Sequence, residues 1–315
     1  SSSFKSSKFY DQTIRLINSD SVTVVEKSWE GEPTIGDLKP VISELEIIKP
    51  DYIIALGGGS VIDGAKLAWM FYECPTLRDE DIFKPFSIPP LRGKSLFASI
   101  PTTIGSGSEV SSAAVMIDEL TKSKKAIVTH DFLSDLVILD PELVKEVPKE
   151  ILKSTIADAL SHATEGYVSN VNNPIMDILA EKSISTIGQN INNFLVDDPS
   201  LTTIVSLQNA SMLAGIVQNH CVIGMSHAIA HQLSTYNIGH GLANGLLMPS
   251  VIKFNMKCSE TNKKYDELIS KSGLKNINDL INMFDTLVNL EKPKVVFEKK
   301  DIKNICKNAL LDPGA

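Results

Sequence analysis

The chain has 315 residues, of which 43% are hydrophobic and 22% are charged, and this length and composition suit a globular protein with two domains. Its formal net charge of -8, with lysines spread rather than clustered, argues against a nucleic-acid partner. No apolar run approaches the roughly 20 residues of a membrane span and the start lacks a secretory signal pattern, so we expect a cytoplasmic protein with no membrane partner.

The first half of the chain alternates β-rich apolar runs with helical periodicity, which is the pattern of a parallel sheet covered by helices. Strands are predicted at residues 22–25, 51–56, 95–100, 113–117, 125–128 and 135–140, and helices at 37–48 and 60–71. Long helical stretches follow, beginning with residues 149–169 and 173–195. We therefore predict an α/β dinucleotide-binding domain with a Rossmann-like parallel sheet over residues 1–149, and an all-helical domain over residues 150–315.

A triple-glycine turn, in the sequence GGGSVIDGAK, joins the predicted strand at 51–56 to the next helix. Gly58 and Gly59 would let the backbone approach a pyrophosphate, and the N–H groups of a helix N-terminus favour its negative charge. Ser60 could cap this helix and donate to a phosphate oxygen, and Asp63, one turn further on, is a further predicted cofactor-binding residue. The turn thus predicts a dinucleotide site, although such a turn can also be purely structural.

A second polar loop follows the predicted strand at 95–100. Its sequence, SIPTTIGSGSEVSS, includes Thr102, Thr103, Ser106 and Ser111. Two glycine-containing loops at strand ends indicate one shared ligand, and the alternative is a tight loop that binds nothing.

Aspartate and histidine occur at ligand spacing in the helical half of the chain. Asp158 and His162 are four residues apart, so both side chains leave one helix face. His227 and His231 repeat this spacing, and His240 follows nine residues later. An aspartate with three imidazoles suits Fe(II), Zn(II), Co(II) or Mn(II). Because no cysteine joins the set, the pattern favours a catalytic ion with an open position over a structural zinc.

These motifs together resemble the iron-dependent, group III alcohol dehydrogenases, which have a dehydroquinate synthase-like fold. GGGSVIDGAK resembles the family's GGGSxxDxAK turn, and IPTTIGSGSEV resembles its PTTxGTGSEV loop. DALSHATEGY is similar to its DAxxHAxEGY motif, and GMSHAIAHQLSTYNIGHGLAN to its histidine-rich block. The four motifs occur in the family's order between about Asp51 and Asn255.

The resemblance implies a metal-dependent oxidoreductase that transfers a hydride between NAD or NADP and a small aldehyde or primary alcohol, with Fe(2+), Zn(2+) or another divalent ion. It assigns the metal to Asp158, His162, His227 and His240, and a proton-relay role to His231. It places dinucleotide contacts at Gly58, Gly59, Ser60, Thr102, Thr103, Ser106, Ser111, Lys124 and Leu143. We also expect a homodimer or higher homo-oligomer.

Several positions depart from the family pattern. The stretch between His227 and His240 is one residue shorter, Gln232 replaces a usual proline, and the region after Asn255 is shorter. The first strand of the nucleotide domain is absent, and with it the residue that often decides between NAD and NADP. We therefore expect that terminal segments are missing.

Three alternatives stay open. A phosphonoacetaldehyde reductase would share the family and differ in substrate. A dehydroquinate synthase-like lyase would share the fold, but that family uses a glutamate with two histidines for its metal. A catalytically dead relative would keep the dinucleotide loops as a scaffold.

Overall fold

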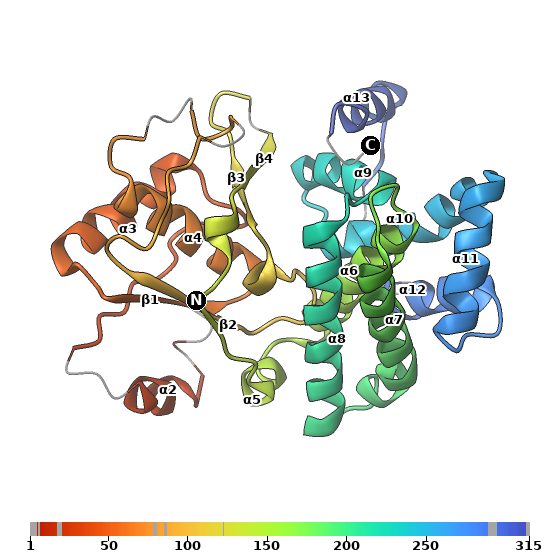
Figure 1. Ribbon diagram of the computed structural model, residues 1–315, viewed down its shortest axis with the longest axis horizontal. Coiled ribbons are helices and arrows are strands. Elements are labelled where there is room, and N and C mark those ends of the chain that lie inside the picture. Colours follow the sequence, from red (N-terminus) through yellow and green to blue (C-terminus); the bar gives the residue numbers. More distant parts are fainter. Residues whose placement is uncertain are drawn as a thin grey trace. The chain divides into compact units, whose positions relative to one another are not determined.

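The computed structural model describes residues 5, 7–17, 21–77, 81–84, 87–121, 123–288 and 295–312. The chain divides into two compact units, shown in Figure 1. The first comprises Ser1–Thr102 and Ser108–Glu146, and the second comprises Thr103–Gly107 and Val147–Ala315. The break after Glu146 lies close to the predicted boundary at residue 149, but the short segment 103–107 groups with the helical unit. Among the described helices, none is both long and apolar enough to span a membrane.

The first unit is built around a three-stranded parallel sheet in the order β1-β2-β5. Its strands are β1 (Tyr52–Gly57), β2 (Leu96–Pro101) and β5 (Leu136–Val137). Tyr52 is in register with Leu96, and Gly57 with Pro101. The carboxyl ends of parallel strands lie at one edge of a sheet, and this edge is where ligands bind in open α/β sheets. The register therefore brings the triple-glycine turn and the start of the second polar loop together.

Two predicted strands form a separate antiparallel pair instead of joining this sheet. These are β3 (Ala113–Ile117) and β4 (Lys124–Val128). The short connection between them explains the arrangement, because parallel neighbours need a crossover of a dozen or more residues.

In its described part, the first unit also contains four helices and two short turns, and α4 (Gly59–Glu73) is the helix that packs on the strands. The helices are α2 (Tyr10–Leu16), α3 (Ile35–Ile48), α4 and α5 (Pro141–Lys145), with the 3₁₀ turns η1 (Ser108–Val110) and η2 (His130–Phe132). A capping box between Thr34 and Asp37 begins α3. The core of the unit joins Leu38 of α3, Trp69 of α4 and Phe97 of β2, all fully buried. α4 packs on both β1 and β3, which places its N-terminus beside the sheet edge.

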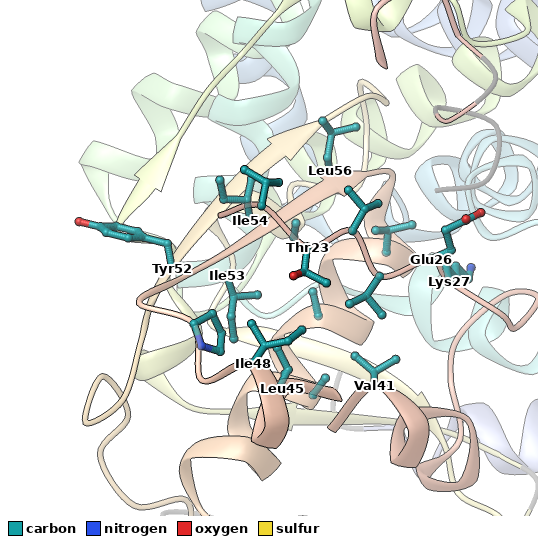
Figure 2. Close-up of a pocket in the computed structure, with 18 of the residues that line it drawn as sticks. Thr23, Glu26, Lys27, Val41, Leu45, Ile48, Tyr52, Ile53, Ile54 and Leu56 are labelled. Atoms are coloured by element: carbon teal, nitrogen blue, oxygen red, sulfur yellow. The ribbon is translucent and has the colours of Figure 1, made fainter. Parts of the chain in front are cut away.

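The strand predicted at residues 22–25 is wrong, because this segment has no regular secondary structure. Val22 and Val24 are exposed, and a strand requires ladder hydrogen bonds that this segment does not make with β1. A cavity of about 570 Å³ lies along it, with Val41 and Leu45 of α3 and Ile53 of β1 among its lining (Figure 2). The β-branched residues of the segment thus border an incompletely filled apolar space.

The second unit is helical, as the sequence predicts. Its helices are α6 (Lys149–Val168), α7 (Pro174–Phe194), α8 (Leu201–His220), α9 (Met225–Leu233), α10 (His240–Asn255), α11 (Ser259–Lys271), α12 (Ile277–Val288) and α13 (Lys299–Ala309), with η3 (Ser234–Tyr236). α6 is buried along most of its length and packs against α7, α8, α10 and α12. Its central position explains why polar residues on it, such as Asp158 and His162, are buried.

Candidate functional site

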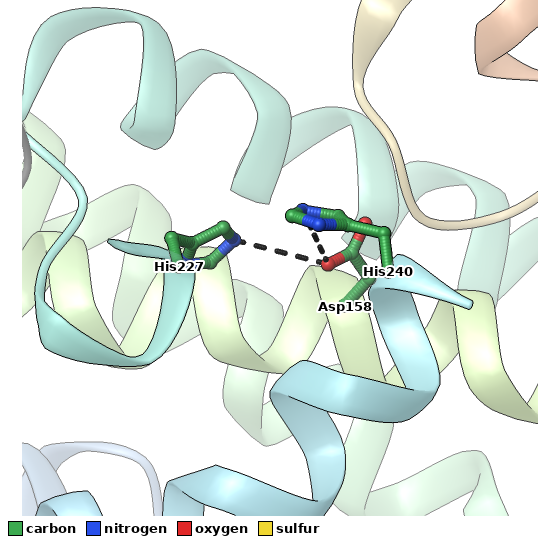
Figure 3. Close-up of side chains that lie close together, drawn as sticks. All are labelled: Asp158, His227 and His240. Atoms are coloured by element: carbon green, nitrogen blue, oxygen red, sulfur yellow. Dashed lines mark ion pairs between the residues drawn. The ribbon is translucent and has the colours of Figure 1, made fainter. Parts of the chain in front are cut away.

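Three side chains of the second unit converge from three helices: Asp158 from α6, His227 from α9 and His240 from α10 (Figure 3). Asp158 Oδ1 lies 3.8 Å from His227 Nε2 and 3.6 Å from His240 Nε2. One ligand atom from each residue lies within 4.8 Å of the others. Asp158 and His227 are buried, and His240 is partly exposed, which leaves an approach from solvent.

This arrangement fits a divalent ion. A tetrahedral ion bonded to N and O atoms at about 2.1 Å separates them by about 3.4 Å, close to the 3.6 and 3.8 Å between Asp158 Oδ1 and the two imidazole nitrogens. His227 Nε2 is buried and has no hydrogen-bond partner among the described residues. A buried polar atom without a partner costs free energy, and a metal bond would remove that cost.

His162, the fourth predicted ligand, lies beside this group but is not part of it. Its ring stacks on His227 with centroids 4.7 Å apart, and its buried Nδ1 has no partner in the described part of the chain. Burial lowers the pKa of His162 to about 4, so the ring is neutral near pH 7. A neutral imidazole is the form that binds a metal.

Two polar side chains that the sequence analysis missed hold the predicted ligands. Glu165 Oε2 accepts a hydrogen bond from His227 Nδ1 at 2.5 Å. Asn244 Nδ2 donates to Asp158 Oδ1 at 2.8 Å and lies 3.2 Å from His240 Nε2. Both could have been found by helical spacing, because Glu165 follows Asp158 by seven residues and Asn244 follows His240 by four, on the same helix faces.

Neighbouring charges and hydrogen bonds oppose the effect of burial on the pKa values of Asp158 and His227. Burial alone would raise the pKa of Asp158, but the imidazoles of His240, His162 and His227 and the Asn244 hydrogen bond lower it. Burial alone would lower the pKa of His227, but the Glu165 carboxylate raises it. The site therefore keeps a carboxylate ionised in a buried position, as a cation-binding site requires.

His231 lies on the same helix as His227 and next to His240. Its ring stacks on that of His240, with centroids 5.2 Å apart and an interplanar angle of 11°. Its Nδ1 contacts Asp312 Oδ2 at 2.8 Å. This contact leaves Nε2 as the nitrogen that could exchange a proton with a substrate.

The triple-glycine turn of the first unit places Gly58 at the N-cap of α4 and Gly59 and Ser60 in its first turn. Lys27 Nζ donates to Ser60 Oγ at 2.7 Å, which the sequence analysis did not anticipate. Burial lowers the pKa of Lys27, while Glu32 and Glu30 oppose the shift. A lysine beside a helix N-terminus and a hydroxyl forms an arrangement that can hold a phosphate.

The predicted cofactor residue Asp63 bonds within the protein. Its carboxylate accepts hydrogen bonds from the Ser108 hydroxyl and, at 2.9 Å, from Val115 N. The neighbouring Lys66 is fully buried and donates to the carbonyl oxygens of Ser108 and Ser111 at 2.6 and 2.7 Å. Burial lowers the pKa of Lys66 to about 8. α4 thus ties residues 108–115 to the glycine turn, and a cofactor contact by Asp63 stays a prediction.

The other predicted cofactor residues are dispersed over the two units. Thr102 is buried after β2, and Lys124 pairs with Glu32 at 2.6 Å. Leu143 is buried in α5. Thr103 and Ser106 group with the second unit. Each of these side chains stays a predicted contact.

Two family models match the chain. The model described as iron-containing alcohol dehydrogenase matches residues 1–141, and that of the C-terminal part of the Fe-containing alcohol dehydrogenase family matches residues 153–310. A solved iron-containing alcohol dehydrogenase from Thermococcus thioreducens is 27% identical with a TM-score of 0.85, over 96% of this chain and 82% of that one.

The chain is also similar to curated proteins, and the fraction of each protein that it covers differs. The chain is 34% identical to an NADPH-dependent butanol dehydrogenase of Clostridium saccharobutylicum, over 92% of this chain and 74% of the relative. It is 35% identical to an aldehyde-alcohol dehydrogenase of Streptococcus pneumoniae serotype 4, over 72% of this chain. That match spans 26% of the relative, so the chain corresponds to a minor part of the longer protein.

Proposed function

Since this chain belongs to the iron-containing alcohol dehydrogenase family, we propose that it transfers a hydride between NAD(P)H and a small aldehyde or primary alcohol. The proposed ion is Fe(2+), or Zn(2+) or another divalent metal in its place. The proposed ligands are Asp158, His162, His227 and His240. The name of the Clostridium relative, an NADPH-dependent butanol dehydrogenase, supports this class of cofactor and substrate.

The observation that carries the proposal is the convergence of Asp158, His227 and His240 around one point. Three helices contribute these groups, and their 3.6 and 3.8 Å separations are those of ligands to a common ion. A carboxylate with imidazoles matches the donor preferences of Fe(II) and Zn(II). His162 would complete the set from its position against the His227 ring.

The proposed reaction moves a hydride from nicotinamide C4 to the carbonyl carbon of the aldehyde and a proton to its oxygen, and the reverse oxidises the alcohol. When bound, the ion supplies Lewis acidity, which lowers the pKa of an alcohol hydroxyl and favours negative charge on a carbonyl oxygen. Asp158 offsets the charge of the cation. We propose that His231 exchanges the proton through Nε2, while Asp312 holds Nδ1.

The glycine turn is the proposed pyrophosphate site. Ser60 and Lys27 are its polar side chains, and the backbone N–H groups at the start of α4 favour an anion.

The alternative functions differ from this proposal in the substrate, in the reaction or in having no activity. The matched family and the Clostridium relative favour a dehydrogenase over a dehydroquinate synthase-like lyase or an inactive scaffold. Phosphonoacetaldehyde stays a candidate within the family.

Metal analysis with an aldehyde panel tests the proposal. The protein is loaded anaerobically with Fe(II) or Zn(II) and assayed with NADH and with NADPH against short aliphatic aldehydes and phosphonoacetaldehyde. We expect about one bound ion per chain and turnover with at least one aldehyde. If the chain binds the ion but shows no turnover under any loading, the proposed dehydrogenase activity is refuted.

Two histidine variants separate metal binding from proton transfer. His227→Ala should abolish both bound metal and turnover, whereas His220→Ala, at an exposed position on α8, should change neither. His231→Ala should keep the ion and lose about 10²-fold or more in kcat, the usual range for general acid–base catalysis. An unchanged kcat in His231→Ala would remove its role as proton relay.

A further inference from the structure

We propose that Glu165 is a positioning residue for the metal: it fixes the orientation and tautomer of His227 so that Nε2 is presented to the ion. The inference rests on the proposed function and adds a residue that the ligand set does not contain. Glu165 is 2% exposed, and its two oxygens are both used in hydrogen bonds.

Within the described part of the chain, the hydrogen bonds to Glu165 come from the segment that carries His227. Oε2 accepts from His227 Nδ1 at 2.5 Å and from Gly224 N at 3.0 Å. Oε1 accepts from Ser226 N at 2.7 Å. In the neutral ring that binds a metal, a carboxylate in this position requires the hydrogen on Nδ1, which leaves Nε2 as the nitrogen with a free lone pair.

The surroundings of the other ring nitrogen of His227 also indicate that Nε2 is presented to the ion. His227 Nε2 is buried without a hydrogen-bond partner among the described residues and faces Asp158 Oδ1 at 3.8 Å. A carboxylate–histidine–metal alignment of this kind raises the basicity of the ligating nitrogen and fixes the ring. Glu165 thus connects α6, which supplies Asp158, to α9, which supplies His227.

Glu165 also accepts backbone N–H groups at the start of α9, so a purely structural role as a helix cap must be separated from positioning of the ligand. A glutamine has the same shape and one acceptor oxygen, but its NH₂ group would face a donor, since the three partners named above are all donors. Glu165→Gln therefore disturbs either the His227 and Gly224 contacts, which share Oε2, or the Ser226 contact, without leaving a cavity.

The experiment titrates the chain with Co(II) in competition with a chelator and compares wild type, Glu165→Gln and Glu150→Gln. Glu150 is on the same helix, and its side chain is 60% exposed. Hydrogen exchange of the α9 amides is measured on each metal-free protein. We expect the Kd for Co(II) to rise about 10- to 100-fold in Glu165→Gln, with α9 exchange close to that of wild type, and no change in Glu150→Gln.

An unchanged Kd in Glu165→Gln would overturn the proposal, as would a weaker Kd that appears only with faster α9 exchange. If Glu165→Gln does not fold, Glu165→Asp is measured instead. It keeps the charge but withdraws the carboxylate by one methylene, and a Kd equal to that of wild type would likewise refute positioning. A wild-type chain that binds no Co(II) would mean that the proposed metal function itself fails, which is a distinguishable result.

Discussion

At the scale of single residues, two stacked imidazoles lie in opposite electrostatic environments. His162 and His227 are both buried, with ring centroids 4.7 Å apart. Burial lowers the pKa of His162 to about 4, whereas the Glu165 carboxylate raises that of His227 despite burial. The difference arises because Glu165 bonds directly to His227 Nδ1, while His162 Nδ1 has no partner among the described residues.

His162 should make the metal-free protein acid-sensitive between pH 6.5 and pH 4. Its pKa is about 4 in the folded chain and 6.5 in the reference state, so in this window the unfolded chain binds a proton that the folded chain does not. The free energy of unfolding then falls as pH falls, by about 3 kcal/mol over the whole window. Urea unfolding of metal-free protein at several pH values measures this slope.

The His162→Gln variant should show a shallower slope in the same window, and His220→Gln, at an exposed position, should follow wild type. His227 does not obscure the comparison. Its raised pKa makes its contribution complete below pH 6.5, and the contribution is lost only as pH rises through the folded pKa. Equal slopes for wild type and His162→Gln would show that His162 is accessible to protons in the folded chain.

Sequence spacing predicted which residues belong near the site but not how each is used. Helical periodicity is local, so it correctly put Asp158 and His162 on one face of α6. The same spacing places Glu165 on the Asp158 face of α6, but its contact with His227 depends on how α9 packs against α6 and leaves no local pattern. For the same reason the internal bonds of Asp63 to Ser108 and Val115 were not predicted.

At the scale of elements, the site depends on the close approach of α10 to α6. A Cβ added at Gly241, one residue after His240, would lie 2.2 Å from Ser154 O and 3.2 Å from the Cβ of Asp158. Ser154 O is a backbone atom and cannot rotate away. Glycine at this position is therefore what lets His240 and Asp158 come together.

Gly241→Ala should push α10 away from α6 and lower both stability and metal affinity. We expect a loss of about 1–3 kcal/mol in the free energy of unfolding, the usual cost of overpacking. Gly239→Ala is the matched control, because its φ is -58° and a Cβ there would have no atom within 4 Å. Urea unfolding and Co(II) titration of both variants measure the effect. A Gly241→Ala protein as stable as Gly239→Ala would show that the helices can separate without cost.

Elements with strong periodicity were predicted closely, and those whose state depends on pairing were not. α6 and α7 begin and end within a residue of the prediction, because their apolar faces and the proline at the start of α7 are local signals. Residues 22–25 have the β-branched composition of a strand but make no ladder. The sequence identified β3 and β4 as strands, but it did not show that they pair with each other and not with the parallel sheet.

At the scale of the whole molecule, the proposed metal ligands all lie in one of the two compact units. Asp158, His162, His227 and His240 belong to the second unit, and the glycine turn belongs to the first. The predicted α/β and helical halves are confirmed by the parallel sheet of the first unit and the helices of the second. The homo-oligomer and the cytoplasmic location stay predictions.

Metal binding should therefore stabilise the second unit directly. An ion that binds only the folded chain adds about 2.7 kcal/mol at a free concentration of 100 times its Kd. Hydrogen exchange with and without Zn(II) measures where this stabilisation acts: amides of α6, α9 and α10 should gain protection, while those of β1 and β2 should change little. In His227→Ala the added Zn(II) should protect neither set. Protection of β1 and β2 equal to that of α6 would mean that the ion binds elsewhere, or that the two units unfold as one cooperative body.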